Sequence, residues 1–486
     1  MAKVRAWNAA GLIGLATLFF GAPAGAGQAP AGGDPVVGSH MRAYVAAVND
    51  GAAASEAFRT QHVLQSHADQ VPAPVFAEYF AQQHRIHGRL QLVETRTSGP
   101  GAAVGLVRDT TYGALHGVTL SLDPQTWRVL EFDPRPAPDW ASARPKATLD
   151  AETLGRRASE LAQHGCDKGA FSGAVLVAKG ATILAETACG PANRRYGAAL
   201  TPESKINLGS MDKMFTAVAV MQLVEAGKVV LDAPISTYLD DTWLPAPFAQ
   251  RITVRHLLTH TSGLGSFLGP AYRKGPANAF KDLADYKRLV RDDTPAFEPG
   301  TRYQYSNTGM LLAGAIVEAA SGESYFDYVR RHVFGPAGMT NTGAFPLDAP
   351  VANLAVGYGW APETPWGWTE NTLGYIYRGS PAGGGFSTVG DMHRFAMALE
   401  AGKLVSPAAM QVLTPLQAPN EYGAGFMISP ETHAGPIVGH EGFYRGVSSQ
   451  LEIYRRNGFV VVILANQDWS APPLGDAIRG LIAAAK

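Results

Sequence analysis

The sequence predicts an α+β protein with more than one domain, and three observations support that prediction. The chain has 486 residues, which is more than a single domain usually contains. In residues 38–135, helical patterns precede several short alternating runs, the order typical of an α+β domain. In residues 149–486, strand-like hairpins at both ends enclose helices. This second pattern predicts one antiparallel sheet, built from both ends of the segment and flanked by an all-helical subdomain.

The elements expected in residues 38–135 follow from hydrophobic periodicity. Helices of this order and length, followed by strands, resemble the cone-shaped fold of the nuclear-transport-factor-2-like (NTF2-like) superfamily. That resemblance is architectural and rests on no catalytic motif. His84 and His87 near a helix end are candidates to line a pocket, although lone histidines in such places are more often exposed. Helices are expected at 41–48, 54–66 and 74–84, and strands at 90–97, 102–108, 115–122 and 127–132.

A Pro-rich stretch at 136–148 predicts a semi-rigid linker to the larger domain. The expected elements of that domain are a helix at 151–164, a hairpin at 172–178 and 182–188, strands at 436–440, 447–454 and 459–465, and a last helix after Leu474. The only two cysteines, Cys166 and Cys189, flank the hairpin. Two readings remain open for them, a disulfide across the strands or a pair of buried thiols. They do not suggest a metal site.

Charge and composition exclude some classes of protein. Hydrophobic residues make up 46% of the chain and charged residues 17%, which is an ordinary globular balance. The net charge is −1 and no run of Lys or Arg stands out, so we expect no nucleic-acid partner.

The first 26 residues have the pattern of a signal peptide. Lys3 and Arg5 precede an apolar run at 9–20, and small residues lead to an expected cleavage site after Ala26. The apolar run is shorter than the roughly 20 residues that a spanning helix needs. We therefore expect a secreted or periplasmic protein with no stable membrane insertion once the signal is removed. An uncleaved anchor is the alternative.

A serine and a lysine lie three positions apart, at Ser210 and Lys213, where a strongly apolar helix begins. Residues i and i+3 share a helix face, so the lysine amine can reach the serine hydroxyl. A serine hydroxyl needs such a neighbour to become a nucleophile, and a buried lysine can act as its base. A Ser-x-x-Lys motif alone is weak, because an exposed helix of this sequence is the simpler reading.

Two further motifs follow in the chain, Tyr305-Ser306-Asn307 and His440-Glu441-Gly442. His433 also begins a His-x-Gly sequence, but it lies in a polar segment, whereas His440 ends an apolar strand. Another pair of histidines, His256 and His260, has a spacing that can bind metal, yet no third ligand accompanies it. We expect packing and hydrogen-bonding roles for this pair.

The three motifs, in this order and in matching contexts, resemble those of the serine β-lactamase and penicillin-binding-protein superfamily. The match is to its class C-like branch, which includes β-lactamases, DD-carboxypeptidases, D-aminopeptidases and esterases. The resemblance covers the chain from Leu149 to the C-terminus. The segments 256–264, 298–300 and 383–391 also resemble that branch.

The resemblance implies a role for each motif residue. Ser210 would be the nucleophile that forms an acyl-enzyme, and Lys213 would accept or shuttle its proton. Tyr305, a phenol near two cationic groups, could ionise and serve as the base that completes acylation and activates water. The sequence leaves open how Lys213 and Tyr305 divide this work. Asn307 would bind the substrate amide and Lys213. No cofactor and no metal is implied.

The third motif would supply the remaining substrate contacts. The oxyanion hole would consist of backbone N–H groups of Ser210 and of Phe443, next to Gly442. His440 would present a donor at the edge of the site. Many β-lactamases have Lys-Thr-Gly here, and their lysine binds the substrate carboxylate. A histidine is at most partly charged near pH 7, which weakens carboxylate recognition unless Arg445 supplies it.

The sequence thus predicts a secreted serine hydrolase that acts on esters or D-amino-acid-type amides, with a small molecule or a peptide, such as a cell-wall peptide, as substrate. One alternative is a class C-like β-lactamase or DD-carboxypeptidase. Another is a catalytically vestigial protein whose small domain binds a ligand.

Overall fold

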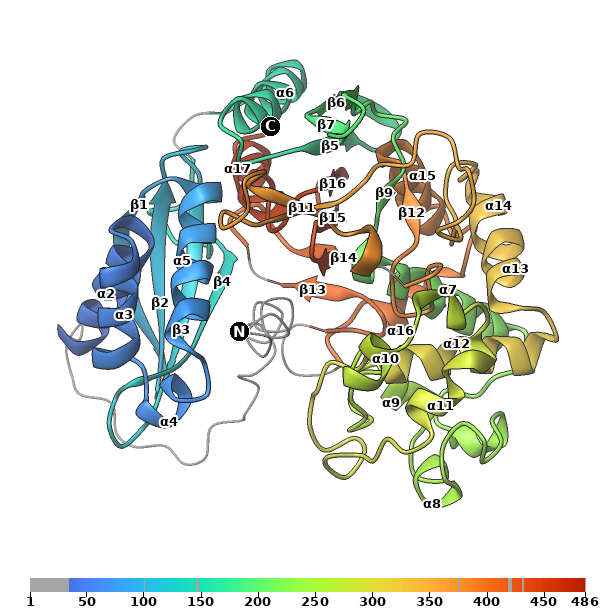
Figure 1. Ribbon diagram of the computed structural model, residues 1–486. Coiled ribbons are helices and arrows are strands. Elements are labelled where there is room, and N and C mark those ends of the chain that lie inside the picture. The colour runs from blue at the N-terminus through green and yellow to red at the C-terminus, as the bar shows by residue number, and fades with distance from the viewer. Residues whose placement is uncertain are drawn as a thin grey trace. The chain divides into compact units, whose positions relative to one another are not determined.

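The computed structural model describes residues 35–99, 101–145, 148–374, 376–417, 422–430 and 432–485 (Figure 1). The expected signal peptide lies outside these residues. Among the described residues, no helix is long and apolar enough to cross a membrane. The chain divides into two compact units, which are treated separately below. The first contains the described residues up to Phe171, a short stretch around His433 and the chain from Pro472 onward.

The first unit begins with helices packed on a four-stranded antiparallel sheet (Figure 1). The predicted helices and strands of this segment are present, with α4 as an additional short helix. Sequence order equals sheet order, as expected when each strand is joined to the next by a turn. The elements are α2 (Pro35–Asn49), α3 (Ala52–Gln61), α4 (Gln65–Ala68), α5 (Ala73–His87), β1 (Leu90–Gly99), β2 (Ala102–Asp109), β3 (Leu115–Leu122) and β4 (Val129–Pro136).

An aromatic cluster fills the space between these helices and the sheet. The ring centroid of Phe58 lies 5.6 Å from that of Phe80 and 5.7 Å from that of Phe132, while Tyr44 lies 5.6 Å from Phe80. Phe58, Phe80 and Tyr44 are almost fully buried. Large aromatic side chains contribute much buried apolar area each, so this cluster supplies the core of the small domain. The NTF2-like assignment stays a prediction.

Two helices from the expected larger domain belong to the first unit. They are α6 (Ala151–Asp167) and nearly all of α17 (Ala471–Ala483). The Asp150 side chain caps α6 by accepting from Thr153 N–H at 2.7 Å. Leu149 N–H donates to Ala484 O at 2.7 Å, which ties the start of α6 to the end of α17. The compact units therefore differ from the domain segments expected from the sequence.

The second unit contains a six-stranded antiparallel sheet in the order β13-β14-β15-β16-β5-β6. Its strands are β5 (Gly173–Lys179), β6 (Thr182–Cys189), β13 (Met427–Ser429), β14 (Ile437–Tyr444), β15 (Val447–Tyr454) and β16 (Phe459–Ala465). The last strand, β16, pairs with the first, β5, along its whole length. This confirms the predicted sheet built from both ends of the segment. All residues of β15 and β16 are buried, as expected for a sheet covered on both faces.

Neither Cys166 nor Cys189 is a free thiol, which excludes the reading as buried thiols.

The helices of the second unit are organised around α7 (Asp212–Glu225), which is buried on almost all sides. It packs against α12 (Asn307–Ser321), and a short 3₁₀ turn, η1 (Gly209–Met211), precedes it. The other α-helices and strands of this unit are β7 (Pro191–Asn193), β8 (Ala198–Ala199), β9 (Ile206–Asn207), α8 (Ala246–Ala249), α9 (Val254–Leu258), α10 (Pro270–Lys274), α11 (Lys287–Val290), α13 (Tyr325–Val329), α14 (Gly335–Ala337), β10 (Tyr358–Trp360), β11 (Trp368–Glu370), β12 (Phe386–Ser387), α15 (Val389–Glu400) and α16 (Pro407–Leu413).

Candidate active site

Ser210 lies in η1, immediately before α7. The sequence predicted one helix with Ser210 and Lys213 in its first turn. The serine instead occupies the tighter turn, and only the lysine lies in α7. Asn207 fixes this turn from the preceding strand, because its Oδ1 accepts from Gly209 N–H at 2.9 Å and its Nδ2 donates to Gly384 O at 3.0 Å.

Two glycines allow the serine turn to approach β14 closely. Gly209 has φ 53°, and a Cβ at this position would lie 2.9 Å from the carbonyl carbon of Gly442 and 3.0 Å from Phe443 N. A Cβ on Gly442 would lie 1.9 Å from Leu208 O. Side chains at either position would force η1 and β14 apart. The pair therefore holds the backbone around Ser210 close to Phe443, the arrangement that an oxyanion hole made by these two residues requires.

The amine of Lys213 is fully buried and has three hydrogen-bond acceptors. Nζ lies 3.0 Å from Ser210 Oγ, 3.0 Å from Asn307 Oδ1 and 2.5 Å from Ala382 O. An ammonium group has three N–H donors, so the charged form is fully satisfied. The neutral amine has only two N–H groups, which the amide and the carbonyl can accept. Its lone pair then faces the hydroxyl of Ser210.

Burial lowers the pKa of Lys213 to about 7, and the carboxylate of the neighbouring Asp212 opposes this shift. Burial also raises the pKa of Asp212 to about 7, although Gly385 N–H donates to this carboxyl at 2.5 Å. A lysine whose pKa is near 7 is well matched to act as a general base near neutral pH.

Tyr305 contacts both Ser210 and Lys213. Its side chain is hydrogen-bonded to Ser210. Lys213 Nζ lies 4.7 Å from the centroid of the Tyr305 ring, over its face. Burial raises the pKa of Tyr305, so the phenol stays neutral at ordinary pH. The suggestion that Tyr305 could ionise beside cationic groups therefore needs correction, because desolvation is the largest influence on its pKa and raises it.

Asn307 is the first residue of α12. The N-cap residue, Ser306, accepts from Gly309 N–H at 2.8 Å. Asn307 Oδ1 accepts from Lys213, as the resemblance implied, and its Nδ2 donates to Ser266 Oγ at 3.1 Å. The cap thus fixes the start of the helix, and the helix start places the amide beside the amine.

The ring of His260 packs against the ring of Tyr305. Its ring centroid lies 4.3 Å from that of Tyr305 and 4.5 Å from that of Tyr422. Its Nδ1 accepts from Ser306 N–H at 3.1 Å, which assigns the ring proton to Nε2. The residue has φ 57°, an unusual conformation for a non-glycine residue. Packing and hydrogen bonding are thus the role of His260, as the sequence suggested.

His440 lies on β14 but is not placed as a donor to a substrate. Its Nδ1 is 2.5 Å from Glu441 O, which can only accept, so Nδ1 carries the proton. Its Nε2 then accepts from the hydroxyl of Tyr422 at 2.9 Å. Burial lowers the pKa of His440 to about 3, so the ring is neutral. The expectation of a donor at the edge of the site is not met in this arrangement, because both ring nitrogens are already engaged.

Arg445 and Phe443 are held by other neighbours. The Arg445 guanidinium donates from Nη2 to Thr369 Oγ1 on β11 at 2.8 Å. The Phe443 ring stacks on Trp469 with centroids 4.7 Å apart. Among the described residues, no hydrogen bond or ion pair joins Arg445 to Ser210. A role for Arg445 in carboxylate binding remains a prediction.

Several polar partners in the site were not found from the sequence. Ser266, Ala382 and Tyr422 each bond to a motif residue from another segment, and Asp212, next to Lys213, accepts from Gly385 N–H. The backbone carbonyl of Ala382 has no side-chain signal at all. The Gly-rich run that follows it, at 383–385, was the only hint that the chain approaches another backbone there.

A half-buried serine beside a fully buried lysine, whose amine also meets a phenol ring and an amide, defines the site of a serine hydrolase. The Beta-lactamase family model matches residues 156–486, and the chain belongs to this family. The first unit's residues up to Gly155 lie outside that match.

Sequence similarity to two proteins is consistent with this assignment. The chain is 30% identical over 323 residues to penicillin-binding protein 4 of Amycolatopsis lactamdurans, covering 62% of this chain and 82% of that protein. It is 34% identical over 237 residues to esterase EstB of Burkholderia gladioli, covering 45% of this chain and 58% of the esterase.

Solved structures share the fold. A penicillin-binding protein from Bacillus halodurans has a TM-score of 0.59 and 32% identity, over 64% of this chain and 96% of its own. A D-amino acid amidase from Ochrobactrum anthropi SV3 also has a TM-score of 0.59, with 22% identity, over 68% of this chain and 98% of its own. The latter likeness concerns the fold alone.

Proposed function

We propose that this serine hydrolase forms an acyl-enzyme on Ser210 and cleaves esters or D-amino-acid-type amides. The observation that carries this proposal is the contact set of Lys213, whose buried amine meets Ser210 Oγ and two further acceptors. A solvated helix with an exposed serine and lysine would show neither this burial nor these partners.

The proton path follows from the contacts of the amine. Neutral Lys213 accepts the hydroxyl proton of Ser210 while Oγ attacks the substrate carbonyl carbon. The bond from that carbon to the leaving group then breaks, and the leaving group takes a proton from the ammonium, directly or through the phenol of Tyr305. Because its pKa is raised, Tyr305 acts in this scheme as a neutral proton relay. Water then attacks the acyl-enzyme ester while Lys213 takes a proton from it, and that proton passes to Ser210 Oγ as the bond between Oγ and the acyl carbon breaks.

The preference for esters and D-amino-acid-type amides rests on the third motif. A neutral His440, with both nitrogens bonded within the protein, offers no charge to a substrate carboxylate. Likeness to esterase EstB supports the ester, and the fold shared with a D-amino acid amidase supports the amide. A panel of p-nitrophenyl esters, D-amino-acid p-nitroanilides and nitrocefin tests this choice, with Ser210→Ala as the blank. Turnover of nitrocefin alone would contradict it.

The second candidate function is that of a β-lactamase or DD-carboxypeptidase. Its support is the identity to two penicillin-binding proteins, from Amycolatopsis lactamdurans and Bacillus halodurans. Stable acylation of Ser210 by penicillin, measured as a mass increase of the intact protein, would favour a penicillin-binding role. Rapid nitrocefin hydrolysis would favour a β-lactamase.

A vestigial site is the remaining alternative, and it predicts no turnover of any of these substrates.

We further propose that the protein is exported, on the basis of the basic start and apolar run of residues 1–26. The intact mass of the protein recovered from its native host tests export, with a chain beginning at Gly27 as the expected result.

A further inference from the structure

A second buried cluster of polar side chains lies in the small domain, and it consists of His87, Asp109 and His116. One ligand atom from each residue lies within 4.8 Å of the other two. His87 is the last residue of α5, Asp109 ends β2 and His116 lies on β3. In the sheet, His116 is the partner of Val107, so Asp109, two residues further along β2, faces the same side.

The ring of His116 is oriented by carboxylates on both sides. Its Nε2 contacts Asp109 Oδ2, and its Nδ1 contacts Asp476 Oδ2 on α17. Asp476 is in turn bonded to Arg479, one turn later on the same helix. A carboxylate on the far nitrogen of a histidine is the usual support for a histidine that ligates a metal, because it fixes the tautomer and the ring. The carboxylate of Asp109 is held as well, since its Oδ1 accepts from Tyr112 N–H at 2.5 Å.

The imidazole of His87 differs from that of His116 in its hydrogen bonding. The residue is 8% exposed, and its ring centroid lies 4.6 Å from that of His116. Its Nδ1 is buried and has no hydrogen bond among the described residues. Buried polar atoms are nearly always paired, so an unpaired nitrogen beside a supported histidine and a carboxylate calls for a specific partner. A cation would supply one.

We propose that His87, Asp109 and His116 bind a divalent transition-metal ion, with zinc as the ion that suits them best. Two imidazole nitrogens and one carboxylate oxygen are a ligand set that zinc accepts, and calcium or magnesium would prefer oxygen alone. Asp476 and Arg479 do not ligate the ion but orient His116. The site lies wholly within the first unit and does not depend on the hydrolase chemistry of Ser210.

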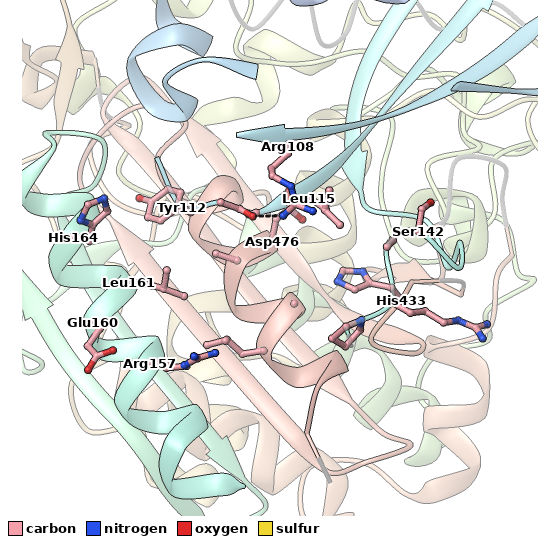
Figure 2. Close-up of a pocket in the computed structure, with 18 residues that line it drawn as sticks. Arg108, Tyr112, Leu115, Ser142, Arg157, Glu160, Leu161, His164, His433 and Asp476 are labelled. Atoms are coloured by element: carbon pink, nitrogen blue, oxygen red, sulfur yellow. Dashed lines mark hydrogen bonds between the residues drawn. The ribbon is translucent and has the colours of Figure 1, made fainter. Parts of the chain in front are cut away.

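A cavity lies beside two residues that contact the proposed ligands. The cavity has a volume of about 710 Å³, and its wall includes Tyr112 and Asp476 (Figure 2). Figure 2 shows Tyr112 and Asp476 among the side chains that line this cavity. Both residues contact the proposed ligands, Tyr112 through Asp109 and Asp476 through His116.

The test measures metal in the full-length protein. Wild type is purified without a histidine tag, stripped with a chelator, reloaded with zinc or cobalt and desalted. Elemental analysis is expected to find one equivalent of zinc, and cobalt is expected to give the visible absorption of a four-coordinate site. His87→Gln should lose both. His84→Gln is the matched control, because His84 lies on the same helix but bonds to Val48 O, and it should retain both.

Other outcomes would overturn the proposal. Wild type that retains no stoichiometric zinc and shows no cobalt spectrum has no such site. Equal loss of metal in His84→Gln and His87→Gln would place the ion elsewhere. Asp476→Asn provides a second measure, because loss of a supporting carboxylate should weaken zinc affinity about 10- to 100-fold without removing a ligand. An unchanged affinity would contradict the orienting role. Circular dichroism of each variant confirms that it is folded.

Discussion

Lys213 in the second unit and His116 in the first are both buried polar groups, but they are stabilised differently. The amine of Lys213 has three acceptors, all from the protein, and one of them, Ser210 Oγ, is the atom that reacts with substrate. The imidazole of His116 lies between two carboxylates, next to the Nδ1 of His87, which has no hydrogen-bond partner among the described residues. The first cluster is complete without any other species, whereas the second is complete only with an additional cation. That difference separates a catalytic site made by the chain from a binding site that awaits an ion.

The largest expected effect comes from removing the nucleophile. Ser210→Ala should lower kcat about 10⁴-fold or more, because the remaining groups have no atom to acylate. The measurement is turnover of whichever ester or anilide the wild type cleaves best. Ser321→Ala is the control, since Ser321 lies at the end of α12, where its hydroxyl donates to Val317 O and accepts from Glu323 N–H. A Ser210→Ala variant with ordinary turnover would move the nucleophile to another residue.

Replacing the base should have a smaller effect. Lys213→Met removes the proton acceptor and should lower kcat about 10²- to 10⁴-fold, the usual contribution of general acid–base catalysis. Lys213→Arg should be impaired as well, because a guanidinium stays protonated. If Lys213→Arg were fully active, the lysine would serve only as a positive charge. Single-turnover measurements separate this effect from changes in substrate binding.

The pH dependence of the wild type reports the same group. Lys213 must be neutral to accept the proton of Ser210, and its pKa is about 7. The value of kcat/KM should therefore rise as the pH increases through about 7 and then level off. No second limb is expected from Tyr305 below pH 10, because burial raises its pKa. A profile that falls as the pH rises from 6 to 8 would contradict the assignment of Lys213 as the base.

Removing metal is expected to affect the two regions differently. Chelation should lower the Tm of the wild type by several degrees, because an ion that binds only the folded state stabilises it. Turnover by Ser210 should not change, since the ligands of the proposed ion lie in the first unit. Differential scanning fluorimetry and an activity assay on the same sample provide both readings. Loss of activity at an unchanged Tm would contradict the proposal that the ion stabilises the first unit and takes no part in turnover.

The smallest expected effect concerns the third motif. Tyr422→Phe removes the hydroxyl that donates to His440 and should destabilise the protein by about 1 kcal/mol, the usual contribution of one hydrogen bond. The freed Nε2 of His440 remains an acceptor, so binding of a substrate carboxylate should not improve. Urea unfolding of Tyr422→Phe and wild type measures the first point, and KM for a carboxylate-bearing substrate measures the second.

The sequence was informative where function depends on local spacing. Ser210 and Lys213 are three residues apart, and Tyr305 and Asn307 two, so each pair is visible in the sequence. The sheet joining both ends of the segment could be predicted because β5, β15 and β16 are short apolar runs with clear turns. His440 was found but misjudged, since its partner Tyr422 lies 18 residues away and has no motif.

The sequence was uninformative where distant segments meet. His87 was expected to be exposed as a lone histidine, yet it is buried beside residues 22 and 29 positions later. Asp476 reaches His116 across 360 residues, a contact that no spacing rule anticipates. The ionisation of Tyr305 was misjudged for a similar reason, because burial depends on every segment that packs around a group, and the sequence shows only the charges next to it.

Labelling with a serine-directed fluorophosphonate tests the central claim most directly. The folded wild type is incubated with the probe, digested and analysed by mass spectrometry, with Ser210→Ala and heat-unfolded wild type alongside. The account predicts one adduct, on the peptide that contains Ser210, which is absent from both controls. A folded, unlabelled Ser210, or an adduct on a different serine, would contradict it.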